Sequence, residues 1–199
     1  VTKERIILRE MLVQEGDSMD ATLFYEHLER SRQNLVNTGL FNTVTMAPLY
    51  ITMRTVVVQV QVNERWYLWP AFIFDLADPN FNTWWRTKDL SRVNYGAYLY
   101  RYNFRGRNET VYLKAQFGYT QQFAVRYKVP NLDRDQRWGL SVGGGYLQQA
   151  EVTAGTIANE RILLNNPDGP NRTEWRADVE MSLRRGHDVR HYGRLGFVE

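Results

Sequence analysis

Residues 109–129 have the sequence ETVYLKAQFGYTQQFAVRYKV, in which apolar and polar side chains alternate over two runs joined by a short polar connection. In the first run Val111 and Leu113 fall on one face, and Lys114 and Gln116 fall on the other. Successive side chains of a strand point to opposite faces of a sheet, so this period of two predicts two strands. The short connection between them is typical of an antiparallel hairpin.

The same alternation continues through residues 65–199, where helical spacing is absent. Turn-forming segments at 105–108, 130–137 and 165–172 separate the apolar runs. The region is therefore predicted to be an all-β antiparallel meander. Its expected strands cover residues 66–75, 93–104, 109–119, 122–129, 136–148, 155–164, 174–184 and 190–198, and the sixth of these alternates poorly.

Two interpretations of these strands differ in what covers their apolar face. In a soluble sandwich that face is core, whereas in a membrane barrel it meets lipid and ends in aromatic residues. Trp138, Tyr146 and Trp175 bound the apolar faces, and opposite charges such as Arg176 and Asp178 share the other face, where they can pair across a wet lumen. These features favour a membrane β-barrel, and a soluble all-β binding protein remains the alternative. No run of about 18 apolar residues is present, which excludes a transmembrane helix.

Residues 1–64 show a different pattern. A mixed apolar run at 5–12 predicts a strand, and residues 17–41 predict two helices or one bent helix with a break near 29–33. Two further strands are expected at residues 44–51 and 56–62, where valines alternate with polar side chains in the second. This order predicts a small α+β unit whose helices cover one face of a short sheet.

The ends of the helical segment carry capping signals. Ser18 or Asp20 is placed to cap its first turn, and Gly39 follows its last residues, where a left-handed terminal residue belongs.

Three segments of this unit resemble a POTRA (polypeptide-transport-associated) domain, a periplasmic module of the BamA superfamily of outer-membrane assembly and transport proteins. They are residues 3–12 (KERIILREML), 28–46 (LERSRQNLVNTGLFNTVTM) and 56–65 (VVVQVQVNER). The resemblance is most specific in Arg9-Glu10, in Ser31-Arg32 with Asn34-Leu35, and in Gly39-Leu40-Phe41. It implies a β-α-α-β-β POTRA domain over residues 1–64.

Residues 103–107 (NFRGR), 127–132 (YKVPNL) and 138–140 (WGL) are similar to the first strands of a BamA-type barrel. In that superfamily the barrel follows directly on the last POTRA domain, and the order found here is similar. The family barrel has about sixteen strands, whereas the 135 residues from Arg65 onward allow roughly eight, and the family's Arg-Gly-Phe loop has no counterpart. We therefore expect residues 65–199 to be the N-terminal part of a transmembrane β-barrel, although nothing in the sequence demands closure.

The resemblance implies an outer-membrane protein assembly factor that folds and inserts β-barrel proteins into the outer membrane of a Gram-negative bacterium. In such a protein the first barrel strand forms one side of a lateral seam where a client strand pairs. The expected seam residues are Trp66, Tyr67, Leu68, Trp69, Pro70, Ala71, Phe72, Ile73 and Phe74. The expected edge of the POTRA sheet for strand addition comprises Val44, Thr45, Met46, Leu49, Tyr50 and Ile51.

The implied partners are unfolded outer-membrane protein clients, periplasmic or lipoprotein accessory subunits, and outer-membrane lipid, with residues 1–64 in the periplasm. A two-partner-secretion or translocation pore of the same superfamily is the alternative within the membrane interpretation.

Composition points away from an enzyme. The chain has no cysteine, which excludes disulfides and thiolate chemistry. Its histidines are His27, His187 and His191, and no helix aligns the last two for metal binding. We find no catalytic constellation and expect no metal or cofactor. Of the 25 basic residues 21 are arginines, but they are scattered among 22 acids, so we expect no nucleic-acid partner.

Overall fold

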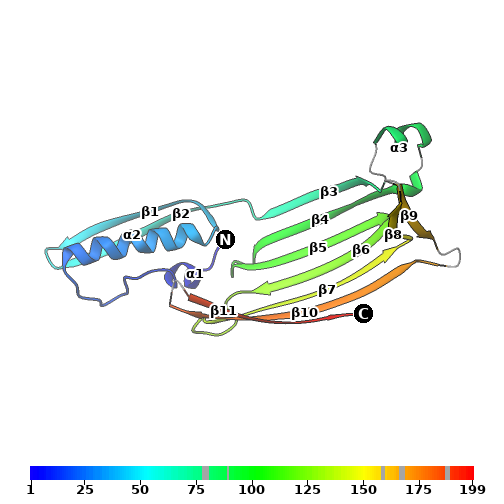
Figure 1. The fold of residues 1–199 in the computed structure, drawn as a ribbon. Helices are drawn as coiled ribbons and strands as arrows, with labels where there is room; N and C mark the ends of the chain where they lie inside the picture. The colour runs from blue at the N-terminus through cyan, green and yellow to red at the C-terminus, as the bar shows by residue number, and fades with distance from the viewer. Residues whose placement is uncertain (78–80, 89, 158–159, 166–168, 187–188) are drawn as a thin grey trace.

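The computed structural model describes residues 1–199 except 78–80, 89, 158–159, 166–168 and 187–188. Two helices and two strands form an N-terminal unit, and a larger sheet follows it (Figure 1). The elements of the unit are α1 (Glu4–Leu8), α2 (Ala21–Asn37), β1 (Phe41–Thr52) and β2 (Thr55–Glu64). The remaining elements are β3 (Leu68–Leu76), α3 (Phe81–Thr87), η1 (Leu90–Arg92), β4 (Val93–Phe104), β5 (Glu109–Gly118), β6 (Thr120–Val129), β7 (Trp138–Gln149), β8 (Glu151–Ile157), β9 (Glu160–Asn165), β10 (Arg172–Arg185) and β11 (Val189–Val198).

The predicted strand at residues 5–12 is wrong, because this segment begins as helix α1. In a strand, each face of the segment would mix charged and apolar side chains. In the structure Ile6 of α1 and Met11, which follows the helix, both belong to the core of the N-terminal unit, where they are 2% and 7% exposed. The observed order is therefore α-α-β-β and not β-α-α-β-β, and the sheet of the unit has two strands.

Residues 17–41 contain a single helix, α2, and the predicted break near 29–33 does not occur. The carboxylate of Asp20 accepts a hydrogen bond from Leu23 N at 2.9 Å, which confirms Asp20 as the helix cap. Gly39 follows with φ of +68°, a conformation that favours glycine. Leu35 is fully buried and packs with Leu40, Phe41 and Val44 against the sheet.

The motif at Ser31 and Asn34 has a clear structural role. Ser31 Oγ accepts a hydrogen bond from Leu12 N at 2.8 Å and donates one to His27 O at 2.6 Å. Asn34 Nδ2 donates to Glu10 O at 3.2 Å. Two side chains of α2 therefore fix the segment that follows α1, without any strand pairing.

The predicted strands at 44–51 and 56–62 are confirmed within β1 and β2, which pair antiparallel. In the second region the predicted antiparallel strands are also found, and seven of them form one sheet in the order β3-β4-β5-β6-β7-β10-β11. The expected strand at 155–164 is not part of this sheet. Strands β8 and β9 pair with each other instead, and β10 pairs directly with β7.

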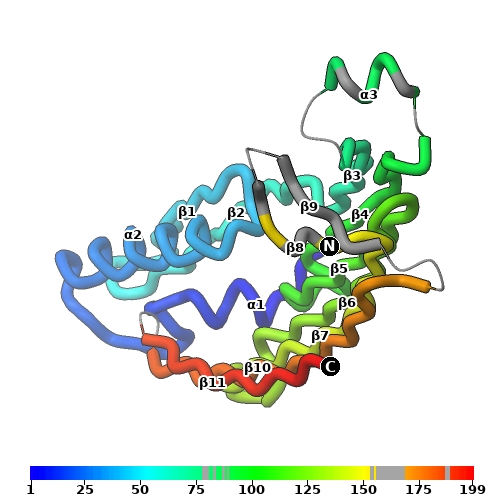
Figure 2. The backbone as a smooth tube through the Cα atoms, turned by 45° about the vertical axis from the view of Figure 1, so that its right-hand side comes forward, coloured from blue at the N-terminus to red at the C-terminus, as the bar shows by residue number. Residues whose placement is uncertain are grey.

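The large sheet is curved, and its two ends differ (Figures 1 and 2). The N-terminal unit lies at one end, called the near end, where residues 105–108 join β4 to β5 and residues 130–137 join β6 to β7. At the opposite, far end, the β3–β4 connection contains α3 and the β7–β10 connection contains the β8–β9 hairpin, while Tyr119 alone joins β5 to β6. Short turns at one rim and long loops at the other are typical of outer-membrane barrels. Within the described residues β3 and β11 are the edge strands, so the sheet is not closed.

Candidate functional site

The large sheet has one continuous apolar face. Directly paired residues share a face, and one such row runs across six strands through Phe72, Ala97, Ala115, Phe123, Tyr146 and Trp175. A neighbouring row contains Leu99, Leu113, Val125, Gly144, Ala177 and Phe197. These side chains are not covered by another layer, since Phe72 is 88% exposed and Val125 is 52% exposed. An exposed apolar surface of this extent marks a contact with lipid or protein.

Aromatic rings form a belt along the far end of this face. Consecutive centroids are 6.0 Å apart from Tyr95 to Phe117, 5.3 Å from Phe117 to Phe123, 6.4 Å from Phe123 to Tyr146, and 4.6 Å from Tyr146 to Trp175. Phe74 pairs with Tyr95 and brings this aromatic belt to the edge strand β3. Belts of aromatic side chains mark the water interface of membrane barrels.

The opposite, polar face carries paired charges. Arg126 donates to Asp178 through both terminal nitrogens, at 2.8 and 2.6 Å, and Arg194 lies 3.4 Å from the same carboxylate. Gly143 stands directly between Arg126 and Asp178 in the register, and a side chain there would occupy the space of the ion pair. Gly143 of β7 thus leaves room for this cross-strand pair. The predicted charges do form ion pairs, but with other partners, since Asp178 pairs with Arg126, Arg176 with Glu174 and Arg184 with Glu10.

The backbone of β3 has an open edge. Tyr67 O accepts from Tyr102 N at 2.8 Å and Ala77 N donates to Arg92 O at 2.9 Å, and both are directly opposed pairs in the β3–β4 register. In an antiparallel ladder the residues between such pairs point their N–H and C=O groups the other way. The residues of β3 whose backbone groups point to the open side, away from β4, are Leu68, Pro70, Phe72, Phe74 and Leu76. Pro70 therefore lacks only an outward donor and interrupts no bond to β4.

The predicted seam residues fall into two groups. Leu68, Trp69, Pro70, Ala71, Phe72, Ile73 and Phe74 lie in β3. Trp66 and Tyr67 precede the strand, and Tyr67 joins the two parts of the chain, because its hydroxyl donates to Leu40 O at 2.8 Å. Burial raises the pKa of the Tyr67 phenol.

The predicted edge residues of the N-terminal unit all lie in β1, which pairs with β2 and with no other strand in the described residues. Val44 is buried and Met46 packs against the core, whereas Thr45, Leu49, Tyr50 and Ile51 are exposed. The Tyr50 hydroxyl lies 2.7 Å from that of Tyr25, and this hydrogen bond raises the pKa of Tyr50.

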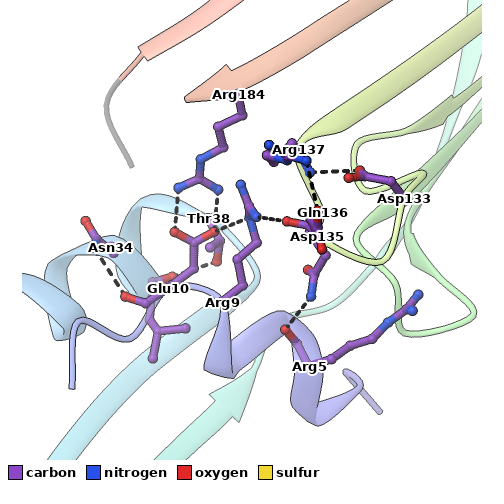
Figure 3. Close-up of polar contacts among 11 residues, drawn as sticks. Arg5, Arg9, Glu10, Asn34, Thr38, Asp133, Asp135, Gln136, Arg137 and Arg184 are labelled. Atoms are coloured by element: carbon purple, nitrogen blue, oxygen red, sulfur yellow. Dashed lines mark hydrogen bonds and ion pairs between the residues drawn. The ribbon is translucent and has the colours of Figure 1, made fainter. Parts of the chain in front are cut away.

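A polar junction holds α1 against the near end of the large sheet (Figure 3). Arg184 at the end of β10 donates two hydrogen bonds to the Glu10 carboxylate, at 2.6 and 2.7 Å, and the two side chains are only 11% and 7% exposed. Arg9 Nη1 donates to Asp135 O at 3.1 Å, and Gln136 Nε2 donates to Arg5 O at 3.0 Å. Burial lowers the pKa of Arg9, and the positive charge of Arg184 lowers it further.

A second set of contacts anchors the chain before α1. Lys3 N donates to Gly106 O at 2.8 Å, and Asn103 Nδ2 donates to Thr2 Oγ1 at 2.7 Å. Residues 103–107, which resemble a family motif, therefore bind the N-terminal segment through hydrogen bonds. Sequence reasoning singled out Arg9-Glu10 and this turn only through the resemblance, because no periodic pattern marks a bond between residues so far apart in the chain.

A polar cavity of about 690 Å³ lies between α2 and the near end of the polar face. Asn34 and Asn37 line it from the helix, and Lys128, Arg184 and Tyr192 line it from the sheet. The polar face is thus accessible from the side of the N-terminal unit.

In the described part of the chain no helix is long and apolar enough to cross a membrane. Across the same residues, no three histidine or acidic side chains gather in a metal-binding arrangement. His187 of the histidine pair lies outside the described residues.

No protein-family model and no curated protein matched this sequence. Solved structures did match, among them the crystal structure of BamA from Haemophilus ducreyi lacking POTRA domains 1-3, at 17% sequence identity and a TM-score of 0.62. The match covers 100% of this chain and 33% of that chain, so the present sequence spans about a third of the length of the solved protein. Likeness at this identity concerns the fold alone, and the fold of the described residues is similar to that of part of this BamA structure.

Proposed function

We propose that this chain belongs to an outer-membrane assembly factor that inserts β-barrel proteins into the bacterial outer membrane. The observation that carries the proposal is the open edge of β3 beside an apolar face, in a sheet with a BamA-like fold. The proposed role needs no chemical catalysis and no cofactor.

The energetics of lipid explain why such an edge is useful. An unpaired backbone N–H or C=O group in the hydrocarbon region costs several kcal/mol, so an incoming strand gains by pairing before it leaves water. The outward groups of Phe72, Phe74 and Leu76 offer a template for that pairing, whereas the carbonyl of Leu68 already accepts a hydrogen bond from Trp66 Nε1. The missing donor at Pro70 weakens this template locally, which favours exchange of the client over permanent closure.

We further propose that residues 1–64 are a POTRA domain in the periplasm and that residues 65–199 are the N-terminal part of the barrel. The contacts of α1, Tyr67 and Asn103 place the unit at the rim with the short turns, which is the periplasmic rim in outer-membrane barrels. The outer side of β1 is the proposed site where unfolded clients or lipoprotein subunits add a strand.

Site-specific photocrosslinking in cells tests the function. A photoreactive residue at Phe72 reports on the open edge, and the same residue at Val125, on the same apolar face but within the sheet, is the matched control. We expect nascent barrel proteins of several kinds to crosslink at position 72 and not at position 125. Equal labelling at both positions, or none at position 72, would refute client pairing at β3.

A translocation pore is the second candidate, and the charged polar face with the cavity beside α2 favours it. A pore passes its substrate along this face, so crosslinks would appear at Tyr112, which lies between Tyr100 and Arg126 in the register. A single crosslinked substrate at position 112 would support export over insertion.

A further inference from the structure

The far-end connection between β3 and β4 carries an aromatic helix. In α3 the rings of Phe81, Trp84 and Trp85 pack on one another, with centroids 5.9, 5.8 and 6.3 Å apart. Their spacing of three and four residues places them on one side of the helix. Phe81 and Trp85 are nevertheless 57% and 58% exposed, so within the described residues these two rings are largely open.

Two basic side chains lie beside this cluster, and the acidic residues nearest to it in the sequence, Asp78 and Asp89, are outside the described residues. Arg86 lies within α3, and Lys88 Nζ stands 5.6 Å from the centroid of the Trp85 ring. Tryptophan and phenylalanine on one side of a short amphipathic helix, with basic residues beside them, fit the boundary between lipid headgroups and acyl chains. The phosphates of the headgroups complement Arg86 and Lys88, whereas an apolar protein groove would offer these cations no counter-charge.

The position of α3 continues the proposed lipid surface. The aromatic belt reaches β3 at Phe74, and α3 begins seven residues later at Phe81. In Figures 1 and 2 the helix stands clear of the other elements beyond the far end of β3. The belt and the helix thus follow one another along the chain at the same rim of the sheet.

We propose that the aromatic side of α3 binds the lipid surface of the outer leaflet and anchors the far end of edge strand β3 there. This inference rests on the proposed membrane location and adds a lipid-binding element to it. Its consequence is that the seam strand is tethered to lipid at one end by its loop and to the N-terminal unit at the other end by Tyr67.

Environment-sensitive labels test this anchor, and the absence of cysteine from residues 1–199 makes single-cysteine variants specific. In the protein reconstituted into phospholipid vesicles, Trp85→Cys places a fluorescent label on the aromatic side. Asn82→Cys places it on another side of the same helix and is the matched control. Val125→Cys reports on the apolar face of the sheet, and heat-modifiable gel mobility shows that each variant is folded.

We expect the label at position 85 to be blue-shifted and to lose fluorescence to a quencher attached near the lipid headgroups, with a smaller loss at position 82. If position 125 is quenched by lipid but position 85 is not, the anchor is refuted and the membrane location stands. If neither is quenched, the proposed membrane location fails as well. A blue shift at position 85 without lipid quenching would show a protein contact and overturn the choice of lipid.

Discussion

The buried ion pair between Glu10 and Arg184 is expected to set the strength of the junction between α1 and the large sheet. Removing one partner of a buried pair leaves an uncompensated charge and costs about 3–5 kcal/mol. Glu10→Ala leaves the guanidinium of Arg184 near that of Arg9, whose pKa it already lowers. Arg184→Met leaves Glu10 with Arg9, whose Nε lies 3.9 Å away. We therefore expect Glu10→Ala to be the more damaging change, by at least about 1 kcal/mol.

Replacing both partners at once separates the pair's own contribution from the cost of an orphaned charge. Glu10→Leu combined with Arg184→Met removes both charges, and such apolar replacements are often neutral or stabilising. The double variant should consequently be more stable at the junction than Glu10→Ala alone.

Native-state hydrogen exchange measures this local stability. The amide of Leu12 donates to Ser31 Oγ and that of Met11 to Leu8 O, so both report on opening of the segment behind α1. A loss of about 3–5 kcal/mol accelerates their exchange by roughly two to four orders of magnitude. Amides in the middle of β5 are the internal control. The reasoning is refuted if Arg184→Met opens the segment more than Glu10→Ala, or if the double variant is as unstable as Glu10→Ala.

Four further predictions follow from the geometry. Phe72→Pro removes an outward N–H of β3, whereas Phe72→Ala removes only the ring. With the photoreactive residue moved to position 74, client crosslinking should fall in the first variant and persist in the second, and equal loss in both would contradict the edge assignment. Leu35→Ala, at a fully buried position, should lower the free energy of unfolding of the N-terminal unit by about 2–5 kcal/mol in a denaturant titration. Burial raises the pKa of Asp133, but the backbone N–H groups of Trp138 and Arg137 hold it below its usual value. Because the folded pKa is depressed, the ionised Asp133 stabilises the 130–137 turn above the unfolded pKa of about 3.9, and this stabilisation is lost as pH falls through the folded pKa. The turn should therefore become protease-sensitive in acid, and Asp133→Asn should remove that pH dependence. The apolar face predicts that the purified chain aggregates without detergent and shows heat-modifiable gel mobility with it, and a monodisperse, detergent-free sample would contradict a lipid-facing sheet.

The strands of the large sheet could be predicted because each carries its own signal. Alternation over residues 93–104 predicted β4 with its observed bounds, and the turns at 105–108 and 130–137 were equally local. Local signals failed where distant residues decide the structure. Residues 5–12 are helical at their start because Glu10 meets Arg184 and Ile6 enters the core, and neither partner is visible within the segment itself.

In the candidate site, too, only the features with a local sequence signal could be predicted. The strand that holds Leu68 to Phe74 could be predicted from its apolar run, and it lies at an edge of the sheet. Its role as a seam was inferred from the family resemblance and stays a prediction. The direction in which each backbone group points could not be predicted, because it depends on the register with β4. The β8–β9 hairpin could not be placed either, since a short apolar run does not reveal whether it joins the main sheet or pairs with its neighbour.

The near-end contacts of the N-terminal unit also have a mechanical consequence. They touch the sheet at the β4–β5 turn through Gly106, at the β6–β7 turn through Gln136, and at the end of β10 through Arg184. Three attachment points spread over the width of a sheet fix its curvature at that rim. Any widening of the sheet must then resemble the opening of a fan, with small displacements at the pivot beside the N-terminal unit and the largest displacements at the far tips of the strands.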